Sequence, residues 1–257
     1  MERKRLDVLL VERGMAASRA KAQALIRAGR VRVAGRIVTK ASAKVSLTDP
    51  IEVLEPLRYV GRGGYKLEAA LEAFGVNPRG WVCADVGAST GGFTDCLLQR
   101  GAARVYAIDV GRDQLHPALR ADPRVVVMEG VNARYLEALT ERVDLVVMDV
   151  AFISQTKLLP VVRRWVKDDG ALITLVKPQF EAGPGATRSG VVRDPAVWRR
   201  ALRGVVACAE GVGLGALGLI PSPVRGGDGN QEFLLYLRPG VRGDVDVDGA
   251  VAAALAL

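Results

Sequence analysis

Four ionisable residues stand where an α/β sheet could gather them for chemistry. Lys66 lies in GGYKLEAAL at the start of a predicted helix, Asp149 ends DLVVMD, Lys177 ends ALITLVK, and Glu232 begins EFLLYLR. Ligands of open α/β sheets bind beyond the carboxyl ends of strands, where Asp149 and Lys177 are predicted to lie. Each residue alone is most often merely solvated, so the prediction of a catalytic site rests on all four together.

The four side chains suit the activation of a weakly acidic hydroxyl group. A ribose 2′-hydroxyl becomes a nucleophile only with a positioned base or with charges that stabilise the developing alkoxide. A lysine acts as the base only where burial or a neighbouring cation lowers its pKa. The Lys66/Lys177 pair offers that cation, and Asp149 and Glu232 can orient it. Attack on a sulfonium methyl group requires no metal, and the single histidine, His116, excludes a multi-histidine metal site.

The stretch ADVGASTGGFTD, residues 84–95, predicts a glycine-rich turn between a strand and a helix. Its glycines do not have the G-x-G-x-x-G spacing of a dinucleotide site. Asp85 at the strand end would repel a pyrophosphate but favours a cationic ligand such as S-adenosylmethionine, which carries a sulfonium and an amino group. Asp109 follows Asp85 by 24 residues, near the offset at which an acidic side chain binds ribose hydroxyls. For the loop alone, an ordinary strand–helix turn is the alternative.

The S-adenosylmethionine site is therefore predicted around this loop and the ends of the neighbouring strands. Asn132 in EGVNARYL can either hydrogen-bond the adenine edge or form a turn, and the sequence favours neither. The predicted cofactor-binding residues are Asp85, Gly87, Ser89, Gly91, Gly92, Phe93, Asp109, Asn132 and Asp149.

These residues need a scaffold, which the pattern from residue 65 onward predicts. Helical segments, with SQTKLLPVVRRWVKDDG and DPAVWRRALRGVVACAEG among them, alternate with the short apolar runs VCADV, VYAIDV, RVVVMEG, DLVVMDV, ALITLVK, LGALGLI and EFLLYLR. This alternation predicts a mostly parallel sheet covered on both faces, which is a Rossmann-like α/β fold. Cys83, Cys96 and Cys208 lie in apolar patterns and are predicted to be buried thiols.

The first sixty residues have a different composition. They hold 13 Lys+Arg against 6 Asp+Glu, whereas the rest of the chain holds 23 against 22. Nearly all of the net charge of +8 therefore lies in the first sixty residues. Apolar spacing predicts two short helices here, with Gly14 as a stop and Ser18 as an N-cap, followed by small strands. The concentrated charge indicates a polyanion-binding module, with a merely soluble basic surface as the alternative. The predicted RNA-binding residues are Arg5, Arg19, Lys21, Arg27, Arg30 and Arg32.

Two resemblances extend this interpretation. RLDVLLVERG, SRAKAQALIRAGRVRVAGR and DPIEV closely resemble an S4 RNA-binding domain. GGYKLEAAL, DVGASTGGFTDCLL, YAIDVG, VVMDVAFIS, LVKPQFE and GNQEFLLYL resemble the hemolysin-A/TlyA family of S-adenosylmethionine-dependent rRNA 2′-O-methyltransferases, whose catalytic body is of the FtsJ type. The resemblance implies cytidine ribose of small-subunit RNA, and in some members large-subunit RNA, as substrate, and ribosomal subunits as partners. It places the family's tetrad on Lys66, Asp149, Lys177 and Glu232, with Lys177 as the base.

We expect a small α+β S4-like RNA-binding domain at 1–58, a linker at 59–64, an FtsJ-like methyltransferase domain at 65–240 and an acidic, then Ala-rich tail at 241–257. No apolar stretch reaches about 18 residues and no signal peptide is apparent, which predicts a cytoplasmic protein without membrane contact.

Three alternative functions are weaker. A non-catalytic RNA-binding or ribosome-assembly factor would not need the intact loop and tetrad, a direct cytolysin would need an amphipathic membrane helix, and an S4-headed pseudouridine synthase would lack the ADVGASTGG loop.

Overall fold

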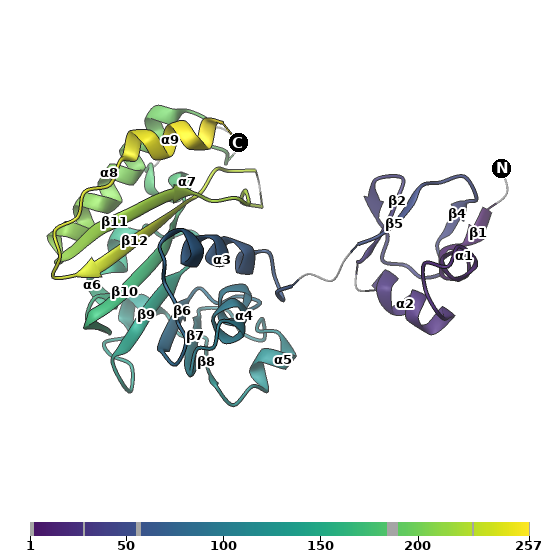
Figure 1. Ribbon diagram of the computed structural model, residues 1–257, viewed down its shortest axis with the longest axis horizontal. Helices are drawn as coiled ribbons and strands as arrows, with labels where there is room; N and C mark the ends of the chain where they lie inside the picture. The colour runs from purple at the N-terminus through teal and green to yellow at the C-terminus, as the bar shows by residue number, and fades with distance from the viewer. Residues whose placement is uncertain (1–2, 28, 55–57, 184–189, 228, 257) are drawn as a thin grey trace. The chain divides into compact units, whose positions relative to one another are not determined.

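The computed structural model describes residues 3–27, 29–54, 58–183, 190–227 and 229–256 (Figure 1). The chain forms two compact units, residues 1–58 and 59–257. Tyr59 is only 1% exposed within the second unit, and helix α3 (Gly63–Ala73) begins four residues later. The segment 59–64, which we expected as a linker, is therefore packed into the second unit.

The N-terminal unit is a small α+β domain. Two helices pack on short antiparallel strands through a core that includes Leu6, Leu10 and Ile26. Ser18 Oγ accepts a hydrogen bond from Lys21 N at 3.3 Å at the start of the second helix, as an N-cap does. Ala34 and Gly35, with φ of +46° and +78°, form a tight hairpin turn. The elements are β1 (Arg3–Arg5), α1 (Leu6–Glu12), α2 (Arg19–Arg27), β2 (Val31–Val33), β3 (Arg36–Ile37), β4 (Lys44–Ser46) and β5 (Ile51–Val53).

The second unit contains a seven-stranded sheet in the order β11-β12-β10-β9-β6-β7-β8. Strands β8, β7, β6, β9 and β10 are parallel, and β12 is antiparallel to both of its neighbours. The chain moves outward from β6 through β7 to β8 and then returns to β9, so a switch point, where ligands bind in such sheets, lies between β6 and β9. The strands are β6 (Val82–Val86), β7 (Arg104–Asp109), β8 (Val125–Glu129), β9 (Val143–Met148), β10 (Val166–Val176), β11 (Leu214–Pro221) and β12 (Phe233–Pro239).

Helices cover both faces of the sheet, as the nearly continuous apolar strands require. Alternate residues of each strand point to opposite faces, so Val146 and Val147 of β9 belong to different apolar clusters. Val146 packs on the face of α6, α8 and α9, and Val147 on the face of α3, α4 and α5 (Figure 1). The remaining helices are α4 (Gly92–Gln99), α5 (Pro117–Arg120), η1 (Ala133–Tyr135), η2 (Gln155–Lys157), α6 (Leu159–Val162), α7 (Pro178–Glu181), α8 (Pro195–Gly211) and α9 (Val247–Leu255).

The structure changes the expected helix at 154–170 and shows the structure of the C-terminal tail. The helix expected across 154–170 is reduced to η2 and α6, because the long strand β10 already begins at Val166. Trp165 and Val166 are both buried there. The tail forms helix α9, capped by Asp246, whose Oδ1 accepts a hydrogen bond from Gly249 N at 2.8 Å. Val251 of this helix is fully buried, so the tail is part of the core.

Within the described part of the chain, no helix is both long and apolar enough to cross a membrane. Cys83 and Cys96 are buried free thiols, as expected, and Cys208 is a half-buried one.

Candidate active site

A cavity of about 750 Å³ opens at the carboxyl ends of the central strands, at the switch point of the sheet. Its volume lies in the range of small-molecule and cofactor sites. Most of the residues predicted from the sequence for catalysis or cofactor binding line it: Lys66, Gly87, Ser89, Gly92, Phe93, Asp109, Asn132, Asp149 and Lys177.

The four tetrad candidates form two ion pairs. Lys66 Nζ donates to Glu232 Oε2 at 2.5 Å, and both side chains are almost fully buried. Lys177 Nζ lies 2.6 Å from Asp149 Oδ1, with side chains 13% and 22% exposed. The two carboxylates that were expected to orient the lysines are their partners, Glu232 for Lys66 and Asp149 for Lys177. Glu232 stands behind Lys66 rather than in the cavity wall.

The glycines of the loop make room for protein as well as for a ligand. Gly87 has a φ of +84°, and a Cβ on it would lie 2.5 Å from the Asp149 carbonyl oxygen of the neighbouring strand. Gly91, the N-cap of α4, has a φ of +97°, and a Cβ there would overlap the Leu119 side chain. A Cβ on Gly92 would approach the Gly64 backbone nitrogen to 3.0 Å. The loop therefore needs glycine so that β9, α3 and α5 can pack against it.

Asp85 lies beneath the loop instead of in the cavity wall. It is fully buried, and Thr94 Oγ1 donates to its Oδ2 at 2.7 Å. Its Oδ1 has no hydrogen-bond partner among the described residues. Burial raises the pKa of Asp85 to about 7, although the Thr94 hydrogen bond opposes the shift. Asp85 and Gly91, both predicted as cofactor ligands, thus stand behind the residues that line the cavity.

Asp109 does line the cavity, at the end of β7. Its Oδ2 accepts a hydrogen bond from Ser89 N at 2.8 Å, and its Oδ1 accepts one from Gly111 N at 2.7 Å. Each carboxylate oxygen keeps acceptor capacity for a ligand hydroxyl. Asn132 caps η1, because its Oδ1 accepts a hydrogen bond from Arg134 N at 3.0 Å, so it forms the turn while it also faces the cavity.

Glu129 supports the cavity wall, and the sequence interpretation missed it. It ends β8 and accepts backbone hydrogen bonds from Asp113, Gln114 and Leu115 at 2.9–3.0 Å. A hydrogen bond from Arg120 and these amides lower the pKa of Glu129 to about 2. This carboxylate fixes the loop that carries Gln114 into the cavity wall. Its position at a strand end, like that of Asp109, is a signal that could have identified it.

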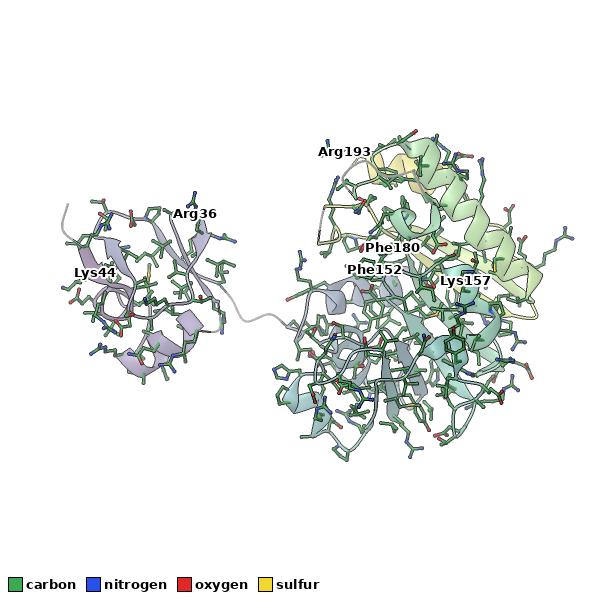
Figure 2. The ribbon with its side chains drawn as sticks, turned by 180° about the vertical axis from the view of Figure 1, so that it is seen from behind. Arg36, Lys44, Phe152, Lys157, Phe180 and Arg193 are labelled. Atoms are coloured by element: carbon green, nitrogen blue, oxygen red, sulfur yellow. The ribbon has the colours of Figure 1, made fainter. Side chains whose placement is uncertain are left out.

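A second missed feature is the segment after Asp149. Phe152 has a φ of +62° and is 91% exposed at the cavity, with its ring centroid 5.1 Å from that of Phe180 (Figure 2). Glu181 accepts hydrogen bonds from Ser154 Oγ at 2.6 Å and Gln155 N at 2.8 Å, and burial raises the pKa of its carboxyl group. Glu181 thereby ties the segment that follows Asp149 to α7, which follows Lys177.

In the N-terminal unit, a buried acid organises part of the predicted RNA-binding set. Asp7 is fully buried and accepts hydrogen bonds from both Arg5 and Arg19 at 3.0 Å. These contacts, with one from Gln23, hold the pKa of Asp7 well below its usual range. The two guanidinium groups are therefore anchored at the surface, with side chains 42% and 56% exposed.

Of the other predicted RNA-binding residues, three each contact a partner of their own and one is exposed. Arg30 donates to the Leu54 carbonyl oxygen at 2.7 Å, and Arg32 pairs with Glu52 at 2.9 Å. Arg27 donates to Gln23 at 2.9 Å, and Lys21 is exposed. Arg36 and Lys44, outside the predicted set, are further exposed cations on this unit (Figure 2).

No group of three or more His, Cys, Asp or Glu side chains that could hold a metal ion occurs among the residues with described positions. The charged groups at the cavity are lysine, arginine and carboxylate side chains.

The fold and the site define an FtsJ-like methyltransferase joined to an S4 domain: family models match residues 59–239 and 4–51, respectively. TlyA of Mycobacterium tuberculosis, named a 16S/23S rRNA (cytidine-2′-O)-methyltransferase, is 47% identical over 241 residues, which are 92% of this chain and 90% of that protein. Hemolysin A of Brachyspira hyodysenteriae is 41% identical over 90% of this chain and 98% of its own length.

A solved structure of a Streptococcus thermophilus protein described as a hemolysin superimposes with a TM-score of 0.78 and 39% identity, over 100% of this chain and 97% of the other. The chain belongs to the TlyA/hemolysin A family. The predicted family and the Rossmann-like α/β fold with an S4 domain in front are confirmed.

Proposed function

We propose that this chain transfers the methyl group of S-adenosylmethionine to the 2′-oxygen of cytidine in ribosomal RNA, of the small subunit and also of the large. The observation that carries the proposal is that the Lys177–Asp149 pair and Lys66, held by Glu232, face the same cavity as Asp109 and the glycine loop. The M. tuberculosis relative is named for this reaction on both 16S and 23S RNA, and it aligns with nearly the whole chain.

The residues of the cavity fit S-adenosylmethionine. Asp109 is placed to accept the ribose hydroxyls, and the apolar residues Val110, Ala133 and Ile153 offer a surface for the adenine. The buried Asp85, with one oxygen lacking a donor, contributes negative charge beneath the loop when it is ionised, which favours a cationic ligand. When bound, S-adenosylmethionine supplies an electrophilic methyl group on a sulfonium sulfur.

The tetrad acts on the ribose. Lys177, oriented by Asp149, is the proposed acceptor of the 2′-hydroxyl proton, which it would take up as the neutral amine. Lys66 is fixed by Glu232 and stabilises the negative charge that develops on the 2′-oxygen. The exposed ring of Phe152 at the cavity offers a stacking surface for the base that carries the target ribose. The basic S4 domain supplies affinity for the phosphate backbone.

Methyl transfer from labelled S-adenosylmethionine to purified ribosomal subunits tests the proposal. The expected product is a 2′-O-methylcytidine, located by mapping of the modified nucleotide in 16S and 23S RNA. The Lys177→Ala variant should methylate RNA far more slowly than the parent while it still binds the cofactor in calorimetry. Cofactor binding and RNA binding without any methyl transfer by the parent chain would favour the non-catalytic ribosome-assembly role instead.

A further inference from the structure

The connection between β11 and β12, residues 222–232, carries a cation to the cavity that the tetrad does not include. Arg225 lines the same cavity as Lys66 and Lys177 and is exposed to solvent. It comes from the side of the cavity where Glu232 holds Lys66. Neither the sequence motifs nor the two ion pairs of the tetrad account for it.

The backbone on both sides of Arg225 is fixed. Before it, Ser222 N donates to the Glu232 carbonyl oxygen at 2.8 Å, and Ser222 Oγ donates to the Val224 carbonyl oxygen at 2.7 Å. After it, Gly226 N donates to the Asn230 carbonyl oxygen at 3.0 Å. Asn230 is itself buried. Arg225 therefore extends from a loop that hydrogen bonds hold in place on both sides of it.

The residue after Arg225 packs directly on the tetrad. A Cβ on Gly226 would lie 2.7 Å from Glu232 Oε1, so the loop backbone passes close to this carboxylate. Glu232 in turn holds Lys66. Arg225 thus directly precedes the glycine that packs on Glu232, the carboxylate that orients a proposed catalytic lysine.

The charges around the cavity leave Arg225 available for an anion. Lys66 and Lys177 are each paired with a carboxylate, whereas Arg62 and Arg225 form no ion pair among the described residues. Asp109, the other carboxylate of the wall, already accepts two backbone hydrogen bonds. An arginine with free N–H groups prefers a carboxylate or a phosphate, which it can bind with two hydrogen bonds.

We propose that Arg225 binds an RNA phosphodiester next to the target ribose. The inference rests on the proposed function, because it requires RNA in this cavity. A phosphate contact reads no base, but it fixes the position of the backbone, so Arg225 sets where the 2′-oxygen lies relative to Lys66 and Lys177. The S4 domain supplies affinity elsewhere on the RNA, and Arg225 supplies local register.

The test uses full-length Arg225→Ala and Arg225→Lys with Arg200→Ala as the matched control. Arg200 is exposed on α8, away from the cavity, and has no ion pair among the described residues. We expect Arg225→Ala to lower kcat/KM for ribosomal subunits by roughly 10-fold, at the low end of what loss of a bidentate charged contact costs. The dependence of log(kcat/KM) on log[salt] should become shallower by about one unit.

Arg225→Lys keeps the charge but not the bidentate geometry, so its loss should be intermediate, and Arg200→Ala should match the parent. Calorimetry should give the same S-adenosylmethionine affinity for all four proteins. Weaker cofactor binding with an unchanged KM for RNA would overturn the proposal, because Arg225 would then hold the cofactor carboxylate. An unchanged rate and salt slope would overturn it as well.

The outcome is separable from that of the proposed function. If the parent chain does not methylate ribosomal subunits, the proposed function fails, and equilibrium RNA binding by the same variants still measures the phosphate contact. If the parent is active and Arg225→Ala equals it in rate and salt dependence, only the role of Arg225 is wrong.

Discussion

Gly87→Ala tests whether the glycine loop is shaped by the backbone of β9. The substitution adds one methyl group, which would lie 2.5 Å from the Asp149 carbonyl oxygen and 3.2 Å from Val150 Cγ1. The first distance is too short for any real contact, and the neighbouring atom is backbone, so β9 or the loop must move. The segment that would move carries Asp149, the partner of Lys177.

Two costs add in this variant. A residue with a side chain at a φ of +84° costs about 1–2 kcal/mol in the left-handed region. Forcing a methyl group into a packed position costs about 1–3 kcal/mol more. Gly80→Ala is the matched control, because Gly80 has a φ of +77° and nothing within 4 Å of the added Cβ, so it incurs only the first cost.

Urea unfolding of the three proteins measures both terms, and methyl transfer measures the displacement of Asp149. We expect Gly80→Ala to lose about 1–2 kcal/mol in unfolding free energy with unchanged activity. Gly87→Ala should lose about 2–5 kcal/mol and also most of its activity. Equal losses of stability in the two variants, or full activity of Gly87→Ala, would refute the argument that the loop is fitted to β9.

Three further perturbations test the site. Lys177→Ala should lower the methylation rate by roughly 10²-fold or more with cofactor binding retained, and Lys177→Arg should fail almost as badly if proton abstraction matters; an active Arg variant would reduce Lys177 to an electrostatic role. Asp109→Ala should weaken S-adenosylmethionine binding in calorimetry, and unchanged affinity would show that the cofactor lies elsewhere. Because burial raises the pKa of Asp85 to about 7, folding favours its protonated form, and unfolding free energy should fall as pH rises from about 4 to about 7. Asp85→Asn, which does not ionise, should make that decline smaller in urea titrations at several pH values, with the buried Glu181 contributing the remainder, and an identical decline in both proteins would contradict the assignment.

The sequence predicted the strands and the residues at their ends, but not how those residues pair. Periodicity places Asp85 and Asp109 at equivalent strand ends, yet Asp85 is fully buried and Asp109 lines the cavity. The difference arises from the register of the two strands: Asp85 pairs with Ala107, two residues before Asp109, so Asp85 lies within the sheet whereas Asp109 ends β7, and register cannot be read from periodicity. The Lys66–Glu232 pair joins residues 166 positions apart and depends on β12 entering the sheet beside β10.

The same limit applies to the glycines and the tail. The motif predicted Gly87 as a cofactor-binding residue, but it could not show that the space beside Gly87 is also filled by the Asp149 carbonyl oxygen. The tail after residue 240 has too few long side chains to show a strong helical pattern. Its helix α9 is stabilised by an Asp246 cap and by packing on α8 and β11, which are tertiary effects.

The ion pairs of the tetrad also determine where RNA affinity must originate. Each lysine at the cavity is neutralised by a carboxylate, and the chain beyond residue 60 holds 23 basic against 22 acidic residues. Such a body cannot attract a polyanion strongly by its net charge, because affinity for a phosphate backbone scales with the number of phosphates that are neutralised. The excess charge of the S4 domain must therefore supply most of the binding, with local contacts at the cavity, such as that of Arg225, fixing the ribose. This division predicts that salt weakens substrate binding mainly through the S4 domain, while the chemical step within the paired tetrad is less sensitive to it.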